Sequence, residues 1–206
     1  MHLGPPRELV VGKPDLAVVL AHGRGGSAAD KAGIAEALAL DDVRYVLLQA
    51  DAGSWYPNRF MAPLADNEPW LTAALDHYER AVSGLIAAGV PETRIIVGGF
   101  SQGACLTSEF LARHPRHYAA AVIFTGGLIG PEGTRWPVRS ELAGMPAYIS
   151  SSEIDEWIPA SRARETVRWL NACGAAAKSV MFEDRTHRVS DEEIGGARQI
   201  VERARR

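Results

Sequence analysis

The chain has 206 residues, of which 47% are hydrophobic and 23% are charged, and its formal net charge is −3. These ordinary globular values argue against a disordered chain or a coiled coil, and they supply no basic field that would attract nucleic acid. No apolar run approaches the roughly 20 residues of a membrane span, and residues 1–10 lack the apolar core of a secretory signal. We therefore expect one domain over residues 1–206, located in the cytoplasm, with neither nucleic-acid partners nor integral membrane association.

Apolar runs typical of strands alternate along the chain with stretches typical of helices, which predicts an α/β fold with a mostly parallel sheet flanked by helices. In chain order we expect a strand over 16–21, a helix over 27–40, a strand over 43–49, a helix over 69–88, a strand over 94–98, a helix over 102–114, strands over 119–124 and 146–151, a helix over 159–171, a strand over 177–182 and a helix over 190–204. Ser27 and Ser190 are suitable caps for their helices. Residues 51–68 show no clear period, and a loop of that length is usually functional.

The motif most informative about chemistry is Gly99-Phe100-Ser101-Gln102-Gly103, which matches G-x-S-x-G. It lies between a predicted strand and a predicted helix, the setting that a nucleophile elbow requires. The two glycines remove Cβ atoms that would collide with neighbouring backbone. The alternative is a glycine-rich turn whose serine only caps the helix; the strand and helix around the motif favour Ser101 as a nucleophile.

A serine hydroxyl is a poor nucleophile near neutral pH and needs an imidazole base, which follows serine and acid along the chain in this architecture. His187 follows the last predicted strand and should reach the same sheet edge as Ser101. The acid should lie on the loop after residues 146–151. The residues alone favour Asp155, which lies mid-loop, and leave open these alternatives: Glu153, Glu156 and, as an outsider, Asp184.

The loop after the first apolar strand reads His22-Gly23-Arg24-Gly25-Gly26. Its small residues allow close approach to a substrate, so we expect the backbone N–H groups of Arg24 and Gln102 to form an oxyanion hole. The Arg24 guanidinium would either form a salt bridge elsewhere or steer an acidic substrate, and the sequence does not choose between these roles.

The same loop also matches a G-x-G-x-x-A dinucleotide fingerprint, from Gly23 to Ala28. That interpretation, an oxidoreductase module, calls for an acidic residue at the end of the next strand to bind the ribose. The strand ends in Gln49 instead, so the fingerprint lacks its partner.

Four segments together resemble the carboxylesterase/phospholipase branch of the α/β-hydrolase superfamily, to which acyl-protein thioesterases belong: HGRGG at 22–26, GFSQGA at 99–104, DEWIP at 155–159 and HRVSDEEI at 187–194. The resemblance implies an α/β-hydrolase fold without a separate lid domain. It implies a Ser101–Asp155–His187 triad, and so selects Asp155 as the acid, and it matches Arg24 and Gln102 to the oxyanion hole.

The activity that the resemblance implies is hydrolysis of carboxylic esters with small to medium acyl chains, with no metal or cofactor required. Acyl thioesterase or lysophospholipase activity with the same triad is the alternative, and a catalytically silent binding protein is a third hypothesis that the complete triad argues against. Many relatives have His-Gly where this chain has Ser151-Ser152, and the thioesterases often have leucine at the position of Arg24. Both departures favour a small-ester hydrolase over a protein-depalmitoylating enzyme.

The expected partner is a small-molecule ester or thioester, and a homodimer is compatible with the sequence. Apolar walls are usual for such sites. Trp55 and Tyr56, in the long loop, and Trp157, beside Asp155, are therefore candidate substrate-binding residues. The alternative is that these aromatic residues pack the rim of the core. Cys105, one helical turn after Ser101, is expected to be a buried small hydrophobe.

Overall fold

The structure, a computed structural model, describes residues 3–205. Its strands form one sheet in the order β1-β3-β2-β4-β5-β6-β7, in which only the β1–β3 pair is antiparallel. The strands are β1 (Gly4–Val11), β2 (Leu16–Ala21), β3 (Val43–Gln49), β4 (Ile95–Phe100), β5 (Ala120–Phe124), β6 (Pro146–Ser152) and β7 (Ala176–Phe182). The predicted mostly parallel sheet is confirmed. The first and last residues of each predicted strand differ by at most two positions from those of an observed strand.

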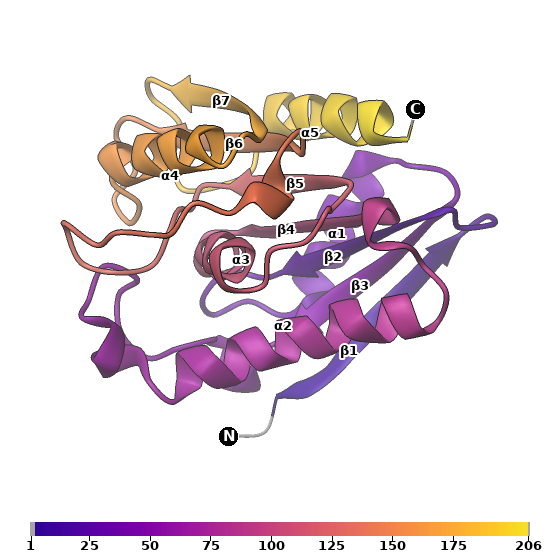
Figure 1. Ribbon diagram of the computed structural model, residues 1–206, viewed down its shortest axis with the longest axis horizontal. Coiled ribbons are helices and arrows are strands. Elements are labelled where there is room, and N and C mark those ends of the chain that lie inside the picture. Colours follow the sequence, from indigo (N-terminus) through magenta and orange to yellow (C-terminus); the bar gives the residue numbers. More distant parts are fainter. Residues whose placement is uncertain (1–2, 206) are drawn as a thin grey trace.

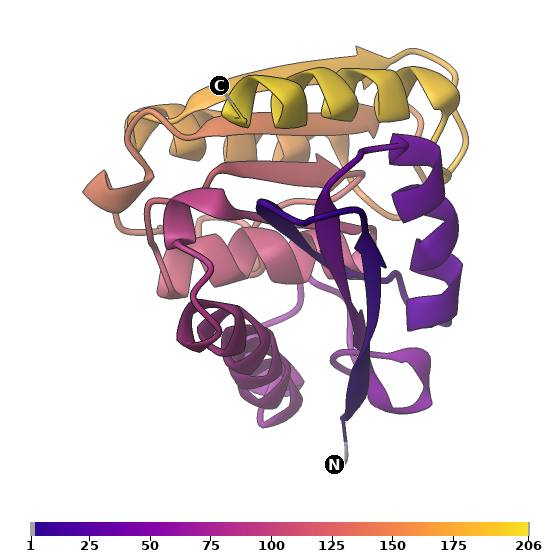
Figure 2. The same cartoon turned by 90° about the vertical axis from the view of Figure 1, so that its right-hand side faces the viewer.

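Helices cover both faces of the sheet (Figure 1; Figure 2). They are α1 (Ala28–Leu38), α2 (Trp70–Ala87), α3 (Gln102–Arg113), α4 (Ala160–Ala172) and α5 (Asp191–Ala204). Helices α2, α3 and α4 pack on one face, and α1 and α5 pack on the other. Each face has its own buried apolar cluster, which explains why the central strands are apolar on both sides.

Strand β1 is the one strand that the sequence pattern does not predict. It pairs with β3 at the edge of the sheet, and most of its residues are exposed or half-buried. Its sequence, GPPRELVV, contains two prolines, which lack the N–H that an inner strand needs. An edge strand tolerates them, and its exposed residues need no apolar run, so the usual strand signal is absent.

Both predicted caps are confirmed. Ser27 and Ser190 accept hydrogen bonds from the backbone of Asp30 and Glu193, and those two side chains bond back to the cap residues. Such reciprocal caps satisfy backbone donors that a helix leaves free at its start.

The connections at the carboxyl ends of the parallel strands are loops, and within residues 3–205 no inserted helical domain covers them. The long segment 51–68 contains only two short 3-10 turns, η1 (Asp51–Gly53) and η2 (Leu64–Asn67). In the described part of the chain, no helix combines the length and apolar character needed to cross a membrane.

Candidate active site

Ser101 occupies a sharp turn between β4 and α3. Its backbone has φ 56° and ψ −121°, a conformation that L-residues rarely adopt and that costs about 1–3 kcal/mol. The Ser101 N–H donates a hydrogen bond of 3.0 Å to the carbonyl of Phe124 on β5, which holds the turn against the sheet. The predicted strand–turn–helix arrangement is present, and it places the serine at the carboxyl edge of the central strands.

The two glycines of the motif allow α3 to start directly against the sheet. A Cβ atom on Gly99 would lie 2.5 Å from the carbonyl carbon of Gly103, and one on Gly103 would lie 2.2 Å from the carbonyl oxygen of Ala21. On the neighbouring loop between β2 and α1, a Cβ on Gly23 would lie 3.2 Å from the Ser101 Cβ. Backbone atoms therefore crowd Ser101 from β2 as well as from α3.

Replacing Gly103 by alanine should destabilise the protein by about 3 kcal/mol or more, because the new methyl group meets rigid backbone and cannot be accommodated by a side-chain rotation. Gly33→Ala is the matched control. Gly33 is exposed within α1, and a methyl group added there would meet no heavy atom within 4 Å, so this change should stabilise the protein by up to about 1 kcal/mol. Urea unfolding of both variants measures the difference; equal midpoints would contradict the argument.

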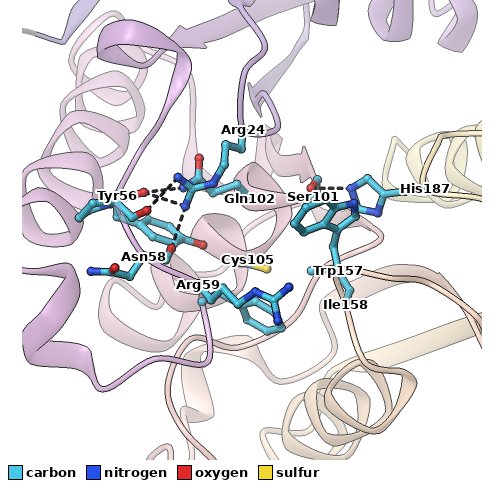
Figure 3. A pocket seen from close by; sticks show the side chains of 12 residues that line it. Arg24, Tyr56, Asn58, Arg59, Ser101, Gln102, Cys105, Trp157, Ile158 and His187 are labelled. Carbon is cyan, nitrogen blue, oxygen red and sulfur yellow. Dashed lines mark hydrogen bonds between the residues drawn. The ribbon is translucent and has the colours of Figure 1, made fainter.

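His187 lies on the loop between β7 and α5 and bridges Ser101 and Asp155. Its Nε2 is 2.7 Å from Ser101 Oγ, and its Nδ1 is 2.8 Å from Asp155 Oδ2. The His187 side chain is 17% exposed, whereas that of Asp155 is fully buried. The three groups thus form a continuous chain of hydrogen bonds with a buried acid at one end, and Figure 3 shows the Ser101–His187 link of this chain.

Asp155 is held by its own loop. Its Oδ1 accepts hydrogen bonds from the backbone N–H groups of Trp157 (3.0 Å) and Ile158 (2.8 Å). These bonds fix the orientation of the carboxylate toward the imidazole. Glu153, an alternative acid two residues earlier in the sequence, forms an ion pair with Arg164 at the surface instead. Of the acids weighed from the sequence, the structure brings Asp155 to His187.

A buried arginine that the sequence pattern does not indicate braces the histidine loop. Arg185 donates to the backbone carbonyls on either side of His187 and to Thr125 Oγ1 at 2.8 Å. Its Nε lies 3.3 Å from Glu193, the carboxylate that caps α5, and both side chains are almost fully buried. Of these contacts, the sequence pattern indicates only the cap that Ser190 and Glu193 form at the start of α5. The orientation of His187 depends on contacts across 60 positions of the chain.

The two predicted oxyanion donors belong to residues close to Ser101: Gln102 follows it directly, and Arg24 follows Gly23, where a Cβ atom would lie 3.2 Å from the Ser101 Cβ. Within residues 3–205, neither the Arg24 N–H nor the Gln102 N–H donates to a protein acceptor. Gln102 begins α3, and the positive end of a helix favours negative charge. Both groups therefore have a free donor near the serine.

The side chains of the same two residues clamp one segment of the long loop. The carbonyl of Tyr56 accepts from Arg24 Nη2 at 2.9 Å and from Gln102 Nε2 at 2.8 Å (Figure 3). Arg24 also donates to Ser54 Oγ and to the carbonyls of Pro57 and Asn58. The sequence leaves open whether the Arg24 guanidinium forms a salt bridge or steers an acidic substrate. Among the described residues Arg24 forms no salt bridge, so the first of these two roles is not observed.

A cavity of about 340 Å³ opens beside Ser101. Its walls are formed by Arg24, Tyr56, Pro57, Asn58, Arg59, Phe60, Ser101, Gln102, Cys105, Trp157, Ile158 and His187. Tyr56 and Trp157 line it, as expected, and Trp157 is 52% exposed at its mouth. Trp55 does not. It is fully buried, and its indole N–H donates to the carbonyl of His22 at 2.7 Å. The alternative that it packs the core applies to Trp55, and we leave it out of the proposed substrate site.

Cys105 is fully buried, as expected, although it touches the cavity. Burial raises the pKa of its thiol to about 12, so the thiol is neutral near neutral pH and is a poor nucleophile there. Burial also lowers the pKa of His22, whose Nε2 accepts from the backbone N–H of Ala50 at 3.0 Å. His22 is thus a neutral, structural histidine below the loop that carries Arg24.

The start of α1, where a dinucleotide would place its pyrophosphate, is occupied by protein side chains. Gln49 Oε1 accepts from the backbone N–H of Ala28 at 2.9 Å, and the Ser27–Asp30 cap satisfies further donors. These contacts argue against the dinucleotide interpretation of the glycine-rich loop. Between residues 3 and 205, no group of three or more His, Cys, Asp or Glu side chains is arranged to hold a metal ion.

Comparisons with known proteins identify a matching family and a curated relative. A family model described as phospholipase/carboxylesterase matches residues 11–203. A curated relative, acyl-protein thioesterase 1 of Eremothecium gossypii, is 29% identical over 171 residues, which are 74% of this chain and 71% of the relative.

The fold has close counterparts among solved structures. A phospholipase/carboxylesterase from Dyadobacter fermentans is 36% identical, with a TM-score of 0.89 over 98% of both chains. Acyl-protein thioesterase 2 of Zea mays superposes with a TM-score of 0.77 over 98% of this chain and 99% of that one. At 16% identity, the second likeness shows the fold alone. Both counterparts support the α/β-hydrolase fold expected from the sequence.

Proposed function

Because this chain belongs to the phospholipase/carboxylesterase family of serine hydrolases, we propose that it cleaves carboxylic esters through an acyl-enzyme on Ser101, with His187 as base and Asp155 as orienting acid. The observation that carries this proposal is the continuous hydrogen-bond chain from Ser101 Oγ through His187 to the buried Asp155. The proposed oxyanion hole is formed by the backbone N–H groups of Arg24 and Gln102.

In the proposed reaction, Ser101 Oγ attacks the acyl carbon while His187 Nε2 takes its proton. Asp155 holds the Nδ1–H and stabilises the imidazolium, and the two N–H groups receive the charge on the former carbonyl oxygen. Collapse of this intermediate expels the alcohol, which takes the proton back from His187. Water, activated by the same histidine, then releases the carboxylic acid and restores the serine.

The substrate class that we propose is small to medium acyl esters. A cavity of about 340 Å³ is near the lower end of the usual range for ligand pockets, and its wall includes Tyr56, Phe60 and Ile158. Thioester or lysophospholipid hydrolysis with the same three residues is the second candidate, motivated by the thioesterase relative. The substrate remains a small molecule under either candidate. A cytoplasmic location, one domain over residues 1–206 and a homodimer stay proposals as well.

The test is a series of p-nitrophenyl esters of increasing acyl length, measured beside acyl-coenzyme A thioesters and lysophospholipids. We expect the highest kcat/KM for short or medium acyl esters. Higher kcat/KM for a long-chain thioester or a lysophospholipid would replace the proposed substrate class, and turnover of none of these compounds would contradict the proposed function.

A further inference from the structure

The charged side chains that line the cavity beside Ser101 are positive. Its lining contains the cations Arg24 and Arg59 but no aspartate or glutamate. The Asp155 carboxylate lies behind His187 and is fully buried, so it does not face the cavity. A bound substrate therefore meets two positive charges that no carboxylate in the wall neutralises.

The two arginines differ in what they can still bind. Both terminal nitrogens of Arg24 donate to oxygen atoms of residues 54–58, so its hydrogen bonds are committed to the loop. In the described part of the chain, the Arg59 guanidinium has neither a hydrogen-bond acceptor nor an ion-pair partner. It contacts the ring of Trp157, whose centroid lies 5.8 Å from the guanidinium carbon. Arg59 thus keeps a planar set of five N–H donors at the cavity.

The backbone beneath Arg59 is firmly placed. The carbonyl of Arg59 accepts from the Asn67 side-chain amide at 3.1 Å, and Asn67 Oδ1 accepts from the N–H of Asn58 at 2.8 Å. Asn67 is fully buried, so these bonds are shielded from water. Arg59 consequently extends from a fixed segment toward Trp157, on the loop across the cavity (Figure 3).

We propose that Arg59 recognises a carboxylate on the substrate, so that the preferred esters carry an anionic group away from the scissile bond. A guanidinium matches a carboxylate through two parallel charge-assisted hydrogen bonds, and the field of Arg24 acts in the same direction. This inference rests on the proposed ester hydrolysis and names its substrate class. It also assigns to Arg24 the role of steering an acidic substrate. The Arg24 charge attracts the anion, whereas the free hydrogen-bond donors belong to Arg59.

The test compares esters that differ in one charge. The carboxylate can lie on the acyl side or on the alcohol side, so two pairs are needed: p-nitrophenyl hydrogen adipate with its methyl ester, and m-butanoyloxybenzoate with its methyl ester. For at least one pair we expect the wild type to prefer the anion by about 10-fold in kcat/KM at low ionic strength. The pair that shows the preference identifies the side that Arg59 contacts.

Arg59→Met should lower this preference about 10-fold, because it removes the donors and the charge. Arg168→Met is the matched control: Arg168 is exposed on α4, outside the cavity lining, and its loss changes the net charge equally. The control should keep the wild-type preference. A second measurement needs no variant, since added salt should reduce the wild-type preference by screening the charges.

Two results would overturn the inference: no preference for the anion in either pair, or a preference that persists in Arg59→Met. If neutral esters are hydrolysed with dependence on Ser101 but without charge preference, this inference fails and the proposed function stands. If neither these four esters nor the unsubstituted p-nitrophenyl esters are hydrolysed, the proposed function itself fails. Hydrolysis of the unsubstituted esters alone would overturn only this inference.

Discussion

Ser101→Ala is expected to lower kcat for p-nitrophenyl butyrate by about 10⁴-fold or more. The alanine removes the only atom that the proposed mechanism joins to the acyl group, and the nearby Cys105 thiol, with its pKa of about 12, cannot replace it. The proposed oxyanion donors belong to the backbone and would survive the change, so some activity above that of water should remain. Initial rates at saturating substrate measure the loss.

Labelling supplies a second readout of the same variant. A fluorophosphonate should add one adduct to the wild type, visible as a mass increase, and none to Ser101→Ala. The matched control is Ser108→Ala, on the same helix, where the buried hydroxyl only donates to the carbonyl of Ala104 at 2.9 Å. It should keep both activity and labelling. An adduct that survives in Ser101→Ala, or a rate near that of the wild type, would contradict the assignment of the nucleophile.

Much of the fold can be predicted because its signals are local. The strands at 16–21 and 43–49 lie under helices on both faces of the sheet, so burial demands apolar residues at every position except the half-buried Arg44 and Gln49. The caps at Ser27 and Ser190 depend on residues only three positions away. Strand β1 escapes prediction because it lies at an edge, where none of its residues is buried and hydrogen bonds to a neighbouring strand are needed on one side only.

The candidate site shows the same limit. Ser101 and His187 can be proposed because one follows a strand within a short motif and the other follows the last strand. The residues alone favour Asp155 among the neighbouring acids, but only the family resemblance selects it, because the sequence does not show which carboxylate turns inward. The geometry that distinguishes it comes from two backbone N–H groups within three residues of it.

Longer contacts cannot be predicted at all. The guanidinium of Arg24 reaches over 30 positions to residues 54–58, and Arg185 reaches 60 positions to Thr125. No periodic pattern in the sequence indicates contacts between residues so far apart along the chain. The sequence suggests Trp55 for the cavity because an aromatic residue in a long loop suits either a wall or a core. The bond from its indole to the His22 carbonyl draws the ring inward.

Asp155→Asn is the second change with a large expected effect, a loss of about 10³–10⁴-fold in kcat. The amide oxygen of the new side chain can take over the bonds that Oδ1 now accepts from the N–H groups of Trp157 and Ile158. Its NH₂ group would then face His187 Nδ1, which is 2.8 Å from Oδ2 in the present structure. A donor at that point forces the imidazole proton onto Nε2, so the histidine can no longer accept the proton of Ser101.

This loss should appear in kcat rather than in KM, because Asp155 lies behind the imidazole and does not line the cavity. Glu153→Gln is the control that separates the two neighbouring acids. Its ion pair with Arg164 is at the surface, where such pairs contribute little, so activity should stay within about twofold of the wild type. Comparable losses in the two variants, or an Asp155→Asn enzyme that keeps about a tenth of the wild-type kcat, would show that this carboxylate does not set the histidine tautomer.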